Sequence, residues 1–264
     1  MQFADYTRLS FERRGRLLHV TLRGTGRMNA VDGPMHEELA RLFPEIQRDP
    51  DSDIVVLTGQ GAAFCAGGDM QWFQDMIDNP ASFRALAPDA KRIIHGLLEL
   101  EKPIVCRLNG HAAGLGASIA LLCDVIVADE KARIGDPHVK VGLVAGDGGA
   151  VIWPQLVGFA RAKELLLTGE MLGAGEAVAM GLINHAVPAQ ELDAKVGEIV
   201  SRIQGNPRWA VRWTKTCMNI ALRDIANKVS DAAIAYEILS NLMADRREAV
   251  QAFVEKRTPD YSGE

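Results

Sequence analysis

The spacing of apolar residues predicts short strands alternating with helices. Strands are expected at 7–11 and 17–22, followed by an amphipathic helix at 34–46. The apolar residues of that helix recur every three or four positions and form one stripe, Met35, Leu39, Leu42, Phe43 and Ile46. The run at 54–59 begins with four consecutive apolar residues, which is typical of a strand in a sheet covered on both faces.

The rest of the chain continues this alternation and then becomes mostly helical. The expected elements are helical sequence over 69–101, a buried strand at 103–108, a helix at 117–123, a strand at 125–128, and helical sequence from about 141 that is interrupted at 182–187. The segment 206–264 predicts three more helices, at 207–223, 228–243 and 245–256. Strands that alternate with helices favour βαβ units and a parallel sheet, so the expected fold class is α/β.

Composition narrows the class of protein. The 264 residues are 48% hydrophobic and 24% charged, which is ordinary for a globular chain, and the net charge of -5 disfavours a nucleic-acid partner. No basic-then-apolar leader opens the chain and no apolar run is long enough to span a membrane, so we expect a cytoplasmic protein. The four cysteines form no CxxC pair and have no histidine at ligand spacing, so neither a disulfide framework nor a metal is expected.

Two glycine-rich turns, at 59–70 and 109–117, each follow a buried strand and precede a helix. Small residues allow another group to approach the backbone closely, and the helix behind each turn presents unpaired N–H groups. Two such turns that face each other would offer two N–H donors to one oxygen, as in an oxyanion hole. The alternative is that the glycines only terminate strands. Neither turn fits a nucleotide-phosphate loop.

Strings of residues along nearly the whole chain resemble the crotonase (enoyl-CoA hydratase/isomerase) superfamily. They are Asn29-Ala30-Val31, the run 63–70, Lys102-Pro103-Ile104-Val105, Asn109-Gly110, Leu167-Thr168-Gly169-Glu170, 177–184 and 252–257. The resemblance implies a crotonase-type spiral of ββα units, a homotrimer or dimer of trimers, and coenzyme A thioester substrates. Residues 1–205 would form the spiral core and 206–264 a C-terminal helical trimerisation region, together a single functional unit.

The resemblance also implies roles for individual residues. The backbone N–H groups of Ala66 and Leu115 would form the oxyanion hole. Coenzyme A would lie along the residues that match the family's binding segment, which are Met28, Ala30, Ala66, Gly68, Asp69 and Met70. Phe253 and Lys256, from a neighbouring subunit, would close over the nucleotide. No cofactor beyond the coenzyme A of the substrate is expected.

The chain departs from the family at the two catalytic glutamates of the hydratases, because Ser118 and His138 stand at those positions. Asp147 follows nine residues after His138. A carboxylate that is hydrogen-bonded to one imidazole nitrogen raises the basicity of the other, so the pair could take a proton from water. The alternative for Asp147 is a helix N-cap.

The strings 142–148 and 151–154 after His138 resemble the branch of the superfamily typified by 6-oxocamphor hydrolase, which cleaves a carbon–carbon bond of a β-diketone with water. The additional glutamate of that branch would match Glu237, for which a solvated helix face is the alternative. The chain nevertheless keeps Ala66-Gly67-Gly68-Asp69, the form typical of coenzyme A users.

The sequence therefore predicts an enzyme that adds water to a CoA-bound acyl group. Ala66 and Leu115 would polarise the thioester carbonyl, and His138, Asp147 and Glu237 would be catalytic. The outcome would be hydration of an enoyl-CoA or hydrolytic cleavage. The alternatives are double-bond isomerisation and a non-catalytic acyl-CoA-binding protein. Four further histidines are expected to be structural, namely His19, His36, His95 and His185, and His111 is expected to pack or to form a hydrogen bond.

Overall fold

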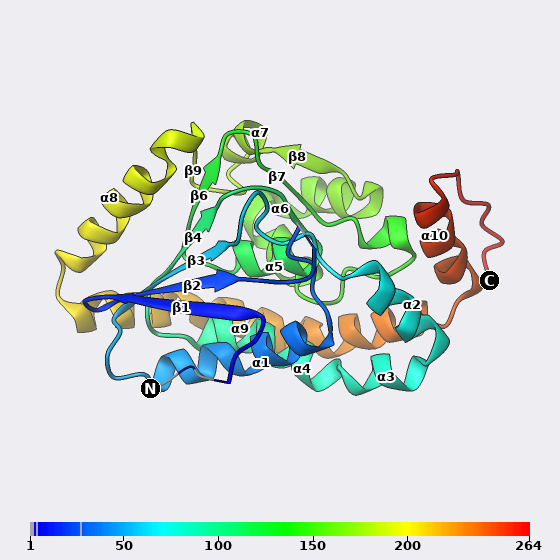
Figure 1. Ribbon diagram of the computed structural model, residues 1–264, viewed down its shortest axis with the longest axis horizontal. Helices are drawn as coiled ribbons and strands as arrows, with labels where there is room; N and C mark the ends of the chain where they lie inside the picture. The colour runs from blue at the N-terminus through cyan, green and yellow to red at the C-terminus, as the bar shows by residue number, and fades with distance from the viewer. Residues whose placement is uncertain (1–2, 4, 27) are drawn as a thin grey trace.

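The computed structural model describes residues 3, 5–26 and 28–264, and its strands form two sheets surrounded by helices (Figure 1). The larger sheet has six strands in the order β1-β2-β3-β4-β6-β9, and the smaller one has three, in the order β5-β7-β8. The strands are β1 (Leu9–Arg14), β2 (Leu17–Leu22), β3 (Ile54–Gly59), β4 (Ile104–Leu108), β5 (Ala112–Ala113), β6 (Val125–Asp129), β7 (Arg133–Gly135), β8 (Met171–Gly173) and β9 (His185–Val187).

Helices connect the strands and make up the C-terminal part of the chain. They are α1 (Gly33–Arg48), α2 (Met70–Asp78), α3 (Pro80–Ala85), α4 (Ala87–Glu99), α5 (Leu115–Leu121), the 3-10 turn η1 (His138–Val141), α6 (Gly149–Thr168), α7 (Ala174–Ala179), the 3-10 turn η2 (Ala189–Glu191), α8 (Leu192–Gln204), α9 (Arg208–Ser240) and α10 (Ala244–Glu255). No helix of the described residues is both long and apolar enough to cross a membrane.

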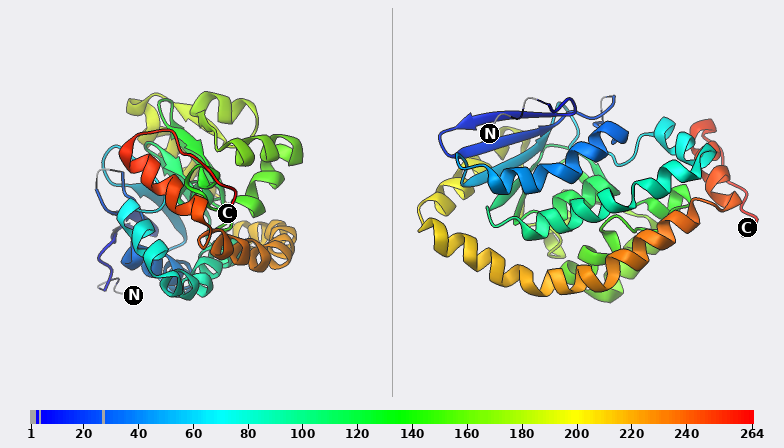
Figure 2. Two further views of the ribbon diagram at one scale, coloured as in Figure 1. Left: turned by 90° about the vertical axis from the view of Figure 1, so that its right-hand side faces the viewer. Right: turned by 90° about the horizontal axis from the view of Figure 1, so that it is seen from below.

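The large sheet is parallel from β2 to β9, and only the β1–β2 hairpin is antiparallel. Strand β3 is buried on both faces, as the apolar run at 54–59 predicts. In β3, Val55 and Leu57 belong to the main core, whereas Ile54 and Val56 pack with α8 on the opposite face. Helix α8 therefore covers one side of the sheet, while α1 and α4 lie on the other side, beside α9 (Figures 1 and 2).

The segment 206–264 differs from its prediction. The structure has one helix, α9, where two were predicted at 207–223 and 228–243, so the predicted break at 224–227 is wrong. The physical reason is that residues 208–240 contain neither glycine nor proline, and Ala226, in the middle of the predicted break, is fully buried. The last predicted helix corresponds to α10.

Two further differences concern short elements. The helical sequence predicted over 69–101 is divided into three helices, because Pro80 begins α3 and Pro88 lies in the first turn of α4. The small sheet was not predicted, since its strands are only two or three residues long. Strands this short leave too few positions for a period of two to be recognised.

Candidate active site

The two glycine-rich turns lie against each other. The N–H of Ala113 donates to the carbonyl of Cys65 at 3.0 Å, and the N–H of Cys65 donates to the carbonyl of His111 at 3.1 Å. A Cβ atom at Gly116 would lie 2.2 Å from the Cys65 carbonyl oxygen, so only glycine permits this approach. The prediction that the turns come together is confirmed.

Two backbone N–H groups at this junction are free to bind a ligand. Among the described residues, neither the N–H of Gly68 nor that of Leu115 has a hydrogen-bond acceptor, and both residues line the same cavity. Leu115 begins α5, where the helix supplies no acceptor for its N–H. The N–H of Ala66, by contrast, donates to the carbonyl of Met28 at 3.0 Å. The prediction that the Ala66 amide is a free donor is therefore contradicted, and Gly68, two residues later, has the free amide instead.

The cavity that Gly68 and Leu115 line has a volume of about 50 Å³, which is room for a few water molecules. Its walls are mostly apolar and aromatic side chains of α2, α3, α4 and α9, including Trp72, Phe73, Phe83 and Ile234. An adjoining cavity of about 190 Å³ shares Gly68, Phe73 and His138 with it. The smaller cavity is thus a mostly apolar space that adjoins a wider one.

His138 is held between two carboxylates. Its Nδ1 contacts Asp136, and its Nε2 lies 3.2 Å from Oδ2 of Asp147. All three side chains are buried, and the hydroxyl of Ser118 donates to Asp147 at 3.3 Å. Asp147 does not cap α6, because Gly148 is the N-cap residue and no side chain bonds there. The predicted His138–Asp147 contact is present, and the N-cap alternative is wrong.

The two carboxylates determine the charge of the imidazole. Burial acts to lower the pKa of His138, but the charges and hydrogen bonds of Asp136 and Asp147 outweigh it and raise the pKa well above its ordinary value. The two carboxylates therefore favour the imidazolium form of His138. Asp136, His138 and Asp147 each offer a ligand atom, and these atoms lie within 4.8 Å of one another, a spacing that could hold a metal ion. In the structure the carboxylates instead contact opposite nitrogens of the imidazole, so the three side chains form a chain of polar contacts.

Glu237, on α9, faces the same cavity as His138 and Asp147. It is only 7% exposed, so the alternative of a solvated helix face is wrong. Burial raises the pKa of Glu237 to about 8; Asp147 adds to the effect, and the charges of His138 and Arg246 oppose it. Glu237 is therefore mostly protonated at neutral pH and can act as an acid.

Arg246, on α10, lies close enough to Glu237 for the charges of the two side chains to interact. It is fully buried, its Nη1 donates to the carbonyl of Val141, and its guanidinium lies 4.5 Å from the centroid of the Phe73 ring. Burial lowers the pKa of Arg246 to about 10 although the charge of Glu237 raises it. An arginine at this place limits the desolvation cost when Glu237 ionises.

Comparison with known proteins identifies the family. The family model described as enoyl-CoA hydratase/isomerase matches residues 12–264. This chain belongs to the enoyl-CoA hydratase/isomerase family. It is 31% identical over 255 residues to 1,2-epoxyphenylacetyl-CoA isomerase of Escherichia coli K12, with 94% of this chain and 95% of that protein covered.

Two solved structures agree with this assignment. An enoyl-CoA hydratase/isomerase from Mycobacterium paratuberculosis is 35% identical with a TM-score of 0.88, and the match covers 93% of this chain and 98% of that chain. A beta-diketone hydrolase from the cyanobacterium Anabaena, bound to (S)-3-oxocyclohexyl acetic acid, is 29% identical with a TM-score of 0.84 and coverage of 91% and 96%. The predicted α/β crotonase fold and the resemblance to the hydrolase branch are thereby confirmed.

The residues predicted to bind coenzyme A fall into two groups. Ala66, Gly68, Met70 and Phe253 line the 190 Å³ cavity together, and Phe253 does so within this same chain. The remaining four do not line it, namely Met28, Ala30, Asp69 and Lys256.

Asp69 has a structural role in this enoyl-CoA hydratase/isomerase family member. Its side chain caps α2 by accepting from the N–H of Gln71 at 2.9 Å, and it accepts from the Thr25 hydroxyl at 2.7 Å. Lys256 ends α10 in the left-handed conformation, with φ 56°, and is exposed.

Three buried residues of the site were missed by the sequence reasoning. Asp136 stands in the string Gly135-Asp136-Pro137 directly before His138, and that proximity was the available signal. His36 is expected from the sequence to be structural, yet it lines the 50 Å³ cavity, and its Nδ1 has no hydrogen-bond partner among the described residues. Arg246 gave no local signal, because its pairing depends on the position of α10.

Proposed function

We propose that this protein binds an acyl-CoA thioester and adds water to its acyl group. The observation that carries the proposal is the convergence of His138, Asp147 and Glu237 on one cavity that also presents the free amides of Gly68 and Leu115. The two amides would polarise the thioester carbonyl, since donors of this kind stabilise a developing oxyanion. The substrate class is supported by family membership.

The arrangement would let one group accept a proton from water while another donates a proton to the substrate. With its ring neutral, His138 would accept a proton from water, and Asp136 at Nδ1 and Asp147 at Nε2 would orient the ring and stabilise the imidazolium that forms. In the hydration of an enoyl-CoA, the hydroxyl would add to the β-carbon and leave an enolate at the thioester. Glu237, protonated at neutral pH, would deliver its proton to the α-carbon, which balances the addition of one water molecule.

The same groups also suit hydrolytic cleavage of a β-oxoacyl substrate. Water would attack the β-carbonyl, the bond between the α- and β-carbons would break, and Glu237 would protonate the carbon of the departing enolate. Likeness to the beta-diketone hydrolase, whose name states this chemistry, favours this route. The acyl group is expected to be apolar, and a polar atom on it would find a partner in the free Nδ1 of His36.

Coenzyme A is expected in the 190 Å³ cavity, because Ala66, Met70 and Phe253 line it and it shares Gly68 with the catalytic cavity. The thioester would then lie where the two cavities meet. A homotrimer or dimer of trimers remains a prediction from the family resemblance, and light scattering would test it.

The test is a mass-spectrometric screen in ¹⁸O-labelled water with wild type and His138→Ala. A panel of enoyl-CoA and β-oxoacyl-CoA thioesters serves as substrates, and the product mass distinguishes hydration from cleavage. Label is expected in product from the wild type, with turnover at least ~100-fold lower for His138→Ala, because general-base catalysis contributes 10²–10⁴-fold.

His185→Ala is the matched control, since His185 lies in β9 and lines neither cavity. Unlabelled, rearranged product would indicate an isomerase and contradict water addition. Tight binding of CoA thioesters without turnover of any of them would indicate a binding protein.

A further inference from the structure

A third cavity, of about 410 Å³, lies at the N-terminal end of α9. The β1–β2 turn, the start of β3, the end of α8 and the first turn of α9 enclose it, and it shares no lining residue with the two cavities of the active site. Glu237 is 25 residues further along α9 than Arg212, which corresponds to roughly 38 Å at 1.5 Å per residue. The α8–α9 junction and α10 lie at opposite ends of the molecule (Figures 1 and 2).

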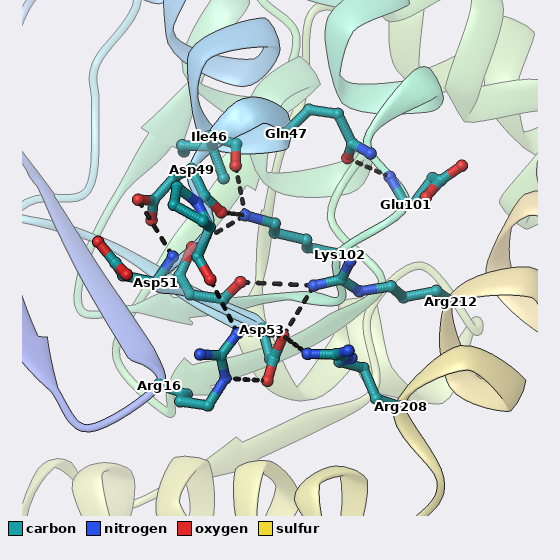
Figure 3. Close-up of polar contacts among 12 residues, drawn as sticks. Arg16, Ile46, Gln47, Asp49, Asp51, Asp53, Glu101, Lys102, Arg208 and Arg212 are labelled. Atoms are coloured by element: carbon teal, nitrogen blue, oxygen red, sulfur yellow. Dashed lines mark hydrogen bonds and ion pairs between the residues drawn. The ribbon is translucent and has the colours of Figure 1, made fainter. Parts of the chain in front are cut away.

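The lining of this cavity has an excess of positive charge. Its charged members are Arg14, Arg16, Arg208, Arg212 and a single acid, Asp53. Figure 3 shows three of these arginines around Asp53. Oδ1 of Asp53 lies 3.0 Å from Nη2 of Arg16, 2.8 Å from Nη2 of Arg212 and 3.5 Å from Nη1 of Arg208. One carboxylate cannot neutralise three guanidinium groups.

The fourth arginine, Arg14, is paired with Glu12 outside the cavity. Both side chains are about 60% exposed, so the pair contributes little and leaves Arg14 able to turn to another anion. The nearby carboxylate of Asp49 is held by Arg13 at 2.8 Å and does not line the cavity. Asp49 and Asp51 act on Arg16 from outside the lining, and within the lining four arginines face one carboxylate.

Arg212 is the buried member of the group. It is 8% exposed, and its Nε has no hydrogen-bond partner among the described residues. Its guanidinium and that of Arg208 each lie 5.2 Å from the centroid of the Trp209 ring, which holds them in place. A buried donor without a partner is costly, so a site of this kind is completed by an acceptor.

The remaining walls indicate the size and chemistry of an occupant. Helix α9 begins at Arg208 with no side-chain cap, so the positive end of its dipole adds to the arginines. Apolar side chains complete the lining, namely Ile54, Pro103, Ile203 and Val211. The volume exceeds that of a bare phosphate and falls within the range of small-molecule sites.

We propose that this cavity binds a small phosphorylated molecule, separate from the substrate. Its phosphate or diphosphate group contacts the four lining arginines, Arg14, Arg16, Arg208 and Arg212, and its organic part contacts the apolar walls. Arginine is suited to this ligand because its planar fork matches phosphate oxygens in pairs.

Isothermal titration calorimetry of the full chain with sodium pyrophosphate and with phenyl phosphate tests the proposal. We expect saturable binding of one molecule per chain below millimolar concentration, and the tighter of the two probes tells whether the organic part contributes. The double variant Arg14→Gln/Arg208→Gln, at two exposed positions, should bind at least tenfold more weakly, because two charge-assisted contacts are lost. Asn206→Trp should block the cavity without changing its charge.

Arg202→Gln is the control, because Arg202 on α8 is exposed, pairs with Glu198 at 3.7 Å and does not line the cavity. The affinity of this variant for pyrophosphate should stay within about twofold of that of the wild type, because salt screens the interaction between distant charges. Equal weakening in Arg202→Gln, or a response that never saturates, would overturn the proposal. Competitive displacement of pyrophosphate by hexanoyl-CoA would assign the anion site to the substrate and also overturn it.

Discussion

Glu237 is a buried carboxyl group whose pKa lies near neutral pH. Its surroundings in the folded protein cause this pKa. Burial is the main cause of the rise to about 8, and the negative charge of Asp147 contributes further. A carboxyl with this pKa exchanges protons readily at physiological pH, whereas an exposed glutamate would already be ionised. The role of Glu237 in proton transfer therefore depends on the packing of α9 against the cavity.

Glu237→Gln should remove the alkaline limb of the pH–rate profile. If protonated Glu237 is the acid, wild-type kcat falls as the pH rises through about 8, because the protonated form is lost there. The variant should have a kcat about 100-fold lower and no limb at that pH. Initial rates between pH 6 and 10 measure both effects, with Glu176→Gln, an exposed carboxyl on α7, as the control.

Folding stability gives an independent readout for the same variant. The folded-state pKa of Glu237 lies above the ordinary value of 4.5, so between these values the native state binds the proton more tightly than the unfolded state. The contribution of Glu237 to stability therefore falls as the pH rises from about 4.5 to 8. The urea midpoint of Glu237→Gln should rise relative to that of the wild type as the pH increases from about 4.5 to 8. A constant difference would contradict the raised pKa.

Helix α9 is the element on which both the active site and the arginine-lined cavity depend. It carries Arg208 and Arg212 in its first two turns and Glu237 in its last. Its N-terminal part is anchored by the contact of Arg212 with Asp53, and its middle by Asn219, whose Nδ2 donates to the carbonyl of Leu98 at 3.0 Å. A rigid, unbroken helix keeps these positions in fixed relation.

Asn227→Pro tests the continuity of α9 at the place where the sequence predicted a break. Asn227 is exposed, so the substitution should act through the backbone, removing one helical hydrogen bond and causing a clash in the preceding turn. We expect a loss of about 3 kcal/mol or more in the free energy of unfolding, measured with urea. Ala210→Pro, in the first turn, should cost much less, because the N–H groups there have no helical acceptor. A small loss for Asn227→Pro would favour two separate helices.

At the scale of the whole molecule, the C-terminal helices are part of the core rather than an appendage. Asn241 on the segment after α9 donates to the carbonyl of Met76 at 2.9 Å, and Lys215 donates to the carbonyl of Lys102 at 3.0 Å. Ala226 and Ile234 are buried, and α9 packs against α4 and α6. The division at residue 205 therefore separates regions that share one interior.

A chain that ends at residue 205 should not unfold cooperatively. Without α9, the buried side chains of α4 lose their cover, and a single domain unfolds as a unit only while its core is intact. Thermal unfolding followed by circular dichroism is expected to show a broad, featureless change. A chain ending at residue 257 is the control, because residues 258–264 contact mainly exposed groups of α10 such as Asp245. A sharp transition for 1–205 would establish an independent domain.

Much of the architecture is encoded locally. The strand at 54–59 was predicted from its apolar run, and the two glycine-rich turns from their small residues, because hydrophobicity and backbone freedom are properties of a short segment. The approach of Cys65 to Gly116 follows from the same glycines. His138 and Asp147 were also paired correctly, since both belong to a stretch of ten residues that resembles a known branch.

Only the tertiary structure decided which way a polar group faces and which distant residues it contacts. The free amide is that of Gly68 and not Ala66, because the chain segment at Met28 takes up the Ala66 N–H. Glu237 lines the same cavity as His138 although 99 positions separate them, and no local pattern specifies whether a helical carboxyl faces a cavity or solvent. The gathering of three arginines at Asp53 likewise arises from elements far apart in the sequence. Sequence patterns determine which segments form helices and strands and which side chains are buried. The packing of those segments determines which polar atoms contact each other and what charge they carry.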